Sequence, residues 1–166
     1  MTIGCSGALL DPNRHARRKL TMMTGEPATE SQRFRRQHKE LMYLAGELMS
    51  FCEPTRVRAQ AAEVRTALVR FTGKLRIHAA MENDAVYPRL INHPREDIRK
   101  KAQSLYNEVG DLYKRFDRYS KQWHDLERLK SEPERFLEET QEMLRMLGMR
   151  MLREDAELYP MVDEVG

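Results

Sequence analysis

Residues 71–91 read FTGKLRIHAAMENDAVYPRLI and contain two polar residues, His78 and Glu82, where an apolar helix stripe is expected to continue. The stripe before them has alternating steps of four and three, the spacing that keeps side chains on one helix face. Its members are Val57, Ala61, Val64, Leu68, Phe71 and Leu75. A buried carboxylate without a partner is very costly, so a polar pair on this face must be hydrogen-bonded, paired with a charge or bound to a metal. The pair is therefore a candidate site.

A similar pattern occurs near the C-terminus. The apolar spacing of residues 136–147 leads there into Arg150 and Glu154. Both segments then end in an aliphatic residue followed by Tyr-Pro, at residues 86–88 and 158–160. The repeat predicts two similar helices with polar side chains at similar depths.

Length and composition indicate one helical domain. The chain has 166 residues, of which 40% are apolar and 33% charged, enough for one four-helix bundle. It lacks an uncharged apolar run of eighteen residues, which predicts no membrane contact, and the N-terminus lacks the basic start of a secretory signal. Cys5 and Cys52 alone do not suggest a disulfide framework, so we expect a cytoplasmic protein.

The stripes predict an all-α, up-down-up-down four-helix bundle over residues 29–166, preceded by an N-terminal arm at residues 1–28. The first helix is expected to begin at Thr29 with a capping box to Gln32. The second should run over about residues 55–91, with a possible kink at Pro88, and the third over about 94–126. A capping box at residues 131–134 is expected to open the fourth. Other all-α arrangements also fit the stripes, but their regular spacing favours near-parallel packing.

Positive charge is concentrated at the start of the chain. Residues 1–39 carry eight Lys/Arg against three Asp/Glu, whereas residues 40–166 carry 21 against 23. Such an arm can attract nucleic acid. Because no nucleic-acid motif accompanies the charges, a solvated arm is the favoured interpretation.

Inward-facing positions of a helix bundle converge, and this is how metal sites are assembled in such folds. The expected inward polar residues come from three helices: His38, His78, Glu82, Arg150 and Glu154. Four of them, all except Arg150, offer the imidazole and carboxylate ligands that iron, manganese and zinc accept.

With these residues the sequence resembles the hemerythrin-like, histidine-histidine-glutamate cation-binding family over about residues 30–163. The similarity consists of the lone His38 in the first helix, the His78-x-x-x-Glu82 motif in the second, and the two Tyr-Pro endings. The resemblance implies a four-helix bundle that holds iron, usually two ions, and binds dioxygen, senses oxygen or iron, or takes part in nitric oxide chemistry. It further implies that His38, His78, Glu82 and Glu154 are metal ligands.

Two of the family's usual histidines are absent. Arg150 stands where the fourth helix should carry one, and Val109 stands where the third helix should. Tyr106 and Tyr113 share the helix face of Val109, so either phenol could bind iron or close the cavity, although aromatic packing is the favoured role.

Arg150 leaves two hypotheses open. A dication 4 Å from a guanidinium would be opposed by roughly 8 kcal/mol at an effective dielectric constant of 20. The first hypothesis is a reduced, mononuclear iron site that binds or senses oxygen, nitric oxide, redox state or iron. The second is a metal-free bundle in which Arg150 bridges Glu82 and Glu154, and which acts as a regulatory protein-interaction module. The joint presence of His38, His78 and Glu82 favours the first, with one iron or none per chain.

An enzymatic role is not expected. A ferritin-like oxidase should carry Glu-x-x-His pairs on two helices, and the sequence has none. It also lacks a nucleophile elbow and a phosphate-binding loop. The expected partners are therefore dioxygen or nitric oxide as a ligand, and an unknown protein.

Overall fold

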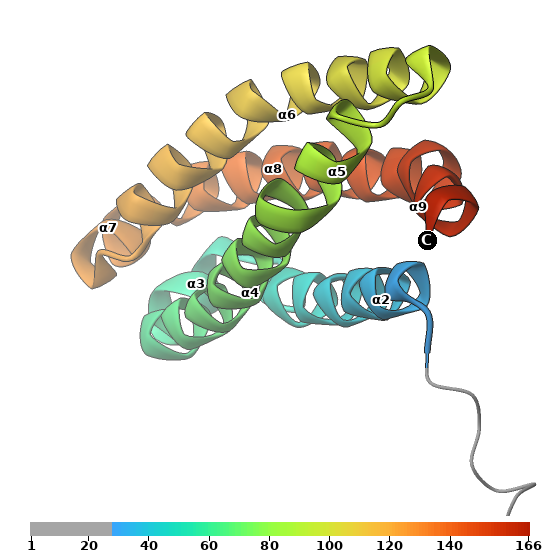
Figure 1. Cartoon of the computed structure of the whole chain (residues 1–166). Helices are drawn as coiled ribbons and strands as arrows, with labels where there is room; N and C mark the ends of the chain where they lie inside the picture. Colours follow the sequence, from blue (N-terminus) through green and yellow to red (C-terminus); the bar gives the residue numbers. More distant parts are fainter. Residues whose placement is uncertain (1–27) are drawn as a thin grey trace, which may run out of the picture.

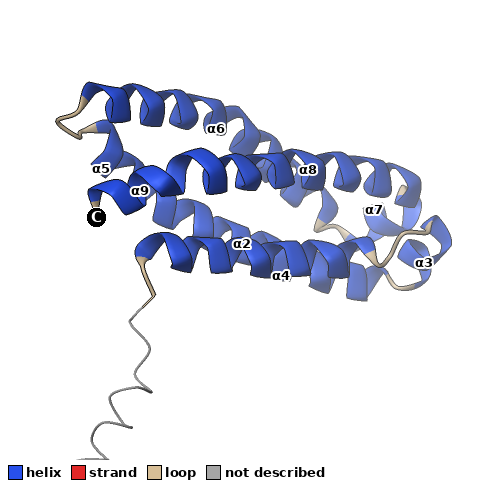
Figure 2. Ribbon diagram, turned by 90° about the vertical axis from the view of Figure 1, so that its right-hand side faces the viewer, coloured by secondary structure: helices blue, strands red, loops and turns tan. Residues whose placement is uncertain are grey.

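The computed structural model describes residues 28–166, and all regular secondary structure in that range is helical (Figures 1 and 2). The helices in chain order are α2 (Glu30–Met49), α3 (Pro54–Ala59), α4 (Ala61–Met81), η1 (Glu82–Val86), α5 (Tyr87–Ile91), α6 (Glu96–Trp123), α7 (Leu126–Ser131), α8 (Pro133–Arg153), η2 (Glu154–Leu158) and α9 (Tyr159–Val165).

The prediction of an all-helical fold is confirmed, while the exact up-down-up-down order stays a prediction. Four helices, α2, α4, α6 and α8, are much longer than the others. Figure 2 shows α6 and α8 running along each other on one side of the molecule, with α2 and α4 along the other. No helix within residues 28–166 is long and apolar enough to cross a membrane. The basic arm expected at residues 1–28 lies outside the described residues, apart from its last residue.

Helix boundaries agree only partly with the sequence. The capping box at the start of α2 is confirmed: the Thr29 hydroxyl accepts the Gln32 N–H at 3.2 Å, and the Gln32 side chain accepts the Thr29 N–H at 3.0 Å. The second predicted helix is instead interrupted at Gln60, whose φ of −116° and ψ of 36° are not helical. The capping box expected before α8 is wrong, because Ser131 ends α7 and Glu132 makes no side-chain cap.

Each of the two repeated segments contains a short π-helix. The Tyr87 N–H donates to the carbonyl of Glu82 in η1, and the Tyr159 N–H donates to the carbonyl of Glu154 in η2. A proline follows each tyrosine. Because proline lacks an N–H and its ring clashes with the carbonyl four residues earlier, the wider π-turn accommodates it without ending the helix. The helix thus passes Pro88, the expected position of a kink, by means of a π-turn.

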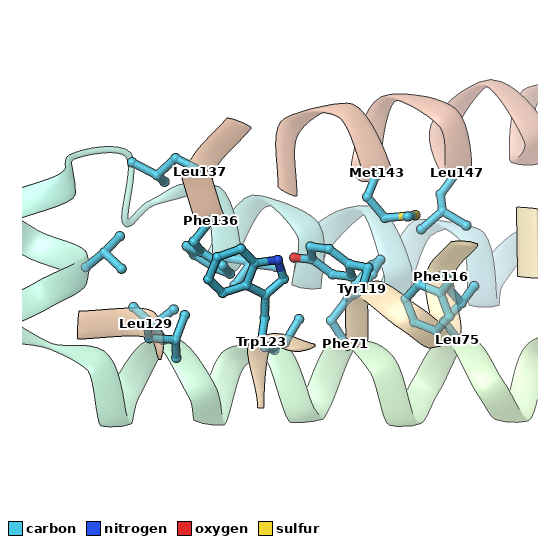
Figure 3. Close-up of a cluster of buried hydrophobic side chains, with 14 of the residues drawn as sticks. Phe71, Leu75, Phe116, Tyr119, Trp123, Leu129, Phe136, Leu137, Met143 and Leu147 are labelled. Atoms are coloured by element: carbon cyan, nitrogen blue, oxygen red, sulfur yellow. The ribbon is translucent and has the colours of Figure 1, made fainter. Parts of the chain in front are cut away.

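The apolar interior of the described residues forms two clusters. The first is packed around Trp123, Phe136 and Phe71 (Figure 3). The second lies around Phe34, Val86, Leu90, Leu105, Leu158 and Tyr159. On three of the four long helical segments, buried polar residues separate the two clusters, as His38 does between Phe34 and Leu41, whereas α6 has the apolar Val109 at this level. The clusters therefore enclose a polar layer.

Candidate metal centre

The polar layer contains the four residues that the sequence singled out as ligands. His38 comes from α2, His78 from α4, Glu82 from η1 and Glu154 from η2. Each is at most 3% exposed, and one donor atom from each lies within 4.8 Å of the others. Residues far apart in the chain thus present two imidazoles and two carboxylates to one point in the interior.

The donor atoms are spaced like the ligands of one metal ion. The two imidazole Nε2 atoms of His38 and His78 lie 3.1 Å apart. Glu154 Oε2 lies 3.4 Å from His38 Nε2, and Glu82 Oε2 lies 3.6 Å from His78 Nε2. Ligand atoms bound at about 2.0–2.2 Å are roughly 3.0–3.5 Å from their neighbours around the ion. The donor set and its spacing therefore fit a single small cation.

Neighbouring acceptors orient both imidazoles. His38 Nδ1 lies 3.1 Å from Asp155 Oδ1, and His78 Nδ1 lies 2.8 Å from Gln37 Oε1. Both oxygens are acceptors, so each Nδ1–H donates outward and each Nε2 faces the centre of the site. This is the arrangement by which outer residues orient metal-binding histidines.

Glu82 is the least satisfied member of the group. Its Oε1 accepts the Tyr159 hydroxyl at 2.7 Å, but its buried Oε2 has no hydrogen-bond partner among residues 28–166. Burial, reinforced by the charge of Glu154, raises the pKa of Glu82 to about 9. Burial and the neighbouring His38 lower the pKa of His78 to about 4. Without a cation, Glu82 therefore holds a proton and His78 is neutral at pH 7.

Arg150 binds the outer side of the site. Its Nε donates to Glu154 Oε1 at 2.6 Å, Nη1 donates to the Leu105 carbonyl at 3.1 Å, and Nη2 donates to the Tyr87 hydroxyl. Burial would raise the pKa of Glu154, but the His38 hydrogen bond and the charge of Arg150 outweigh burial and lower it. Glu154 is therefore ionised, with Oε1 on Arg150 and Oε2 toward His38.

The bridge from Arg150 to both carboxylates is not formed. All three of its donor nitrogens have partners, and Glu82 is not among them. Within the described chain, Arg150 thus balances one of the two buried carboxylates by direct hydrogen bonding.

The third helix contributes no imidazole, because α6 contains no histidine. Val109 is buried at 3% exposure. Tyr113 is half-buried, and burial, together with the charges of Glu82 and Glu154, raises its pKa. Tyr106 is 42% exposed, with its ring centroid 5.2 Å from that of Tyr87, a packing role.

Three residues of the site were not foreseen as such: Gln37, Asp155 and Tyr159. Gln37 and Asp155 are next to ligand candidates in the chain, and no periodicity shows which neighbour turns back onto an imidazole. The repeated Tyr-Pro ending marks Tyr159 in the sequence, but the repeat indicates two similar helix ends and does not show where the hydroxyl points.

A helical bundle that gathers buried imidazoles and carboxylates at one interior point is, as a class, a helical cation-binding domain. The family model of the hemerythrin HHE cation-binding domain matches residues 29–162. The chain therefore belongs to the hemerythrin HHE cation-binding domain family. Neither the curated proteins nor the solved structures provided a match.

Proposed function

We propose that this protein binds one metal ion through His38, His78, Glu82 and Glu154. The observation that carries the proposal is the pair of Nε2 atoms only 3.1 Å apart, each turned inward by an acceptor on Nδ1. Glu154 Oε2 lies 3.4 Å from His38 Nε2, so a bound cation would be shared by both imidazoles and an ionised carboxylate. On binding, Glu82 would release its proton, and its unpartnered Oε2 would supply negative charge at the same place.

The proposed stoichiometry is one ion, not two. A second ion would need more ligands, but Val109 and Arg150 stand where the family usually has histidines. Arg150 also occupies Glu154 Oε1, so this oxygen is not free to bind a second ion. A fixed positive charge and a missing ligand therefore act together against a second ion.

We propose iron as the ion and the binding or sensing of dioxygen, nitric oxide, redox state or iron as the function, on an up-down-up-down frame. Histidine and carboxylate ligands with open positions are typical of non-haem iron, which supplies sites for small molecules when bound. The chain's own contribution is to orient the imidazoles and to exclude water with apolar residues on both sides of the polar layer. We further propose that the protein is cytoplasmic, has no enzymatic role, and passes its signal to another protein.

A second candidate is the metal-free interaction module. Its support is the 2.6 Å contact between Arg150 and Glu154, a buried ion pair that needs no metal. This candidate does not explain why the two imidazole Nε2 atoms and the unpartnered Oε2 of Glu82 lie together in the interior.

Elemental analysis and an optical spectrum separate the two candidates. The protein is purified anaerobically from iron-supplemented cells, and metals are counted per chain. The proposal expects up to one iron per chain, whereas a folded protein without any metal supports the interaction module.

A further inference from the structure

The hydroxyl of Tyr159 contacts two of the ligand residues, at the donor nitrogen of His38 and at the carboxylate of Glu82. Tyr159 Oη is 2.7 Å from Glu82 Oε1 and 3.0 Å from His38 Nε2. These separations are similar to the 3.1 to 3.6 Å between the donor atoms of the other residues. An ion within bonding distance of those donors is therefore within reach of the phenol oxygen.

The ring of Tyr159 is held firmly in this position. The side chain is fully buried, and its ring stacks on Phe34 at a centroid distance of 5.5 Å with an interplanar angle of 21°. The His38 ring lies against it at 5.3 Å. A rigid, fully buried phenol aimed at ligand atoms needs little reorganisation to bind an ion.

The equivalent tyrosine of the other repeat is used differently. Tyr87 follows η1 as Tyr159 follows η2, and both are buried. The Tyr87 hydroxyl, however, contacts Arg150 and not an imidazole. The chain therefore contains a natural control: two tyrosines in equivalent places, of which one faces the site.

We propose that Tyr159 is a fifth ligand of the metal site and that it favours a trivalent ion, ferric iron in this chemistry. The inference rests on the proposed metal binding. On ligation the phenol O–H bond breaks, an oxygen–metal bond forms, and the proton is released to solvent, as for other protonated ligands. Tyrosinate is an established ligand of ferric iron in proteins.

Charge balance favours this assignment. Glu82, Glu154 and an ionised Tyr159 supply three negative charges, which equal the charge of a trivalent ion, while the imidazoles are neutral. The ligand set and a trivalent ion would therefore be neutral in sum, which avoids the desolvation penalty of a net buried charge. Around this set, Arg150 contacts Glu154, and Asp155 contacts His38 and is paired with Arg35.

The experiment loads metal-free wild type, Tyr159→Phe and Tyr87→Phe with ferric nitrilotriacetate and measures iron per chain, visible absorption and resonance Raman spectra. Ferric phenolate has a visible charge-transfer band and tyrosine ring vibrations that ferric carboxylate and imidazole complexes lack. We expect the band in wild type and in Tyr87→Phe, and its loss per bound iron in Tyr159→Phe. Tyr159→Phe should also lose ferric iron more strongly than Zn²⁺, whereas a merely structural role would weaken both equally.

The outcomes distinguish the two proposals. Wild type that is folded by circular dichroism but binds no iron overturns the proposed function and this inference together. Wild type that binds ferric iron without the band, or a Tyr159→Phe protein that keeps it, overturns the inference alone. If Tyr159→Phe does not fold, the band is tested in Tyr87→Phe and Tyr113→Phe, since its loss in either would assign it to that tyrosine instead.

Discussion

At the scale of single residues, the site is defined by groups that have lost their freedom to reorient. The Nδ1 atoms of His38 and His78 are held by Asp155 and Gln37, so both rings keep Nε2 directed into the site. Removing one imidazole should therefore affect metal binding more than any change of the surrounding surface.

For His78→Ala we expect a metal affinity at least about 100-fold weaker, since even the loss of an outer-shell partner of a metal site weakens binding about 10 to 100-fold. Iron per chain after anaerobic purification measures it. His124→Ala is the matched control, because His124 caps the far end of α6, roughly 22 Å along the helix from Val109. Equal iron contents in the two variants would refute the role of His78.

Arg150 is expected to limit how many ions the site can hold. For Arg150→His we expect a higher iron content, because the change removes a fixed cation, adds a neutral ligand and releases Glu154 Oε1. Arg153→His is the control, since Arg153 lies on the same helix and pairs with the surface residues Glu108 and Glu157. If the two variants bind the same amount of iron as wild type, Arg150 does not limit occupancy.

At the scale of helical elements, η1 and η2 carry the similarity between the two halves of the chain. Each π-turn begins at a carboxylate of the site and ends before a tyrosine that faces the site or Arg150. In an α-helix, residues five apart point about 140° away from each other. The π-turn carries one residue more, and so brings Glu154 and Tyr159 to the same side.

This relation predicts an unusual tolerance to deletion. Loss of one residue from a regular helix turns everything after it by about 100°. Deletion of the exposed Ala156 together with Pro160→Ala should instead convert η2 into an α-turn and keep Glu154 and Tyr159 on one face. Thermal unfolding should stay close to that of wild type. The control, deletion of the exposed Gln141 from α8, should greatly lower the unfolding temperature. An equal loss of unfolding temperature in both deletion variants would contradict this role of the π-turn.

The elements also show how far the sequence could be interpreted. The alternating steps of four and three in residues 57–82 are sufficient to place His78 and Glu82 on the buried face. The same periodicity cannot reveal a π-turn. The turn contains one extra residue, but the residues on either side of it remain apolar or polar as before. Nor can it show side-chain hydrogen bonds, so the contacts of Gln37 and Asp155 to the imidazoles, and those of the Tyr159 hydroxyl, needed coordinates.

At the scale of the whole molecule, the site separates two apolar clusters that would otherwise be continuous. The first cluster contains Leu41, Leu75 and Met151, and the second contains Phe34 and Leu158. The polar layer between them holds two imidazoles and two carboxylates in place of apolar contacts. A bound cation would link α2, α4, η1 and η2 across this layer and so stabilise the fold as a unit.

Metal binding should therefore raise the unfolding temperature and protect one end of the molecule in particular. Free metal at about 100 times the dissociation constant stabilises a folded protein by about 2.7 kcal/mol. For a chain of this size that corresponds to roughly 5–10 °C. Hydrogen exchange should slow most in η1, α5, η2 and α9, which pack in the second cluster together with parts of α2 and α6, and least in α7. Chelation should reverse both effects, and His78→Ala should show neither. A metal-induced shift of the same size in His78→Ala would contradict this prediction. It would mean that the stabilising ion does not depend on the His78 imidazole.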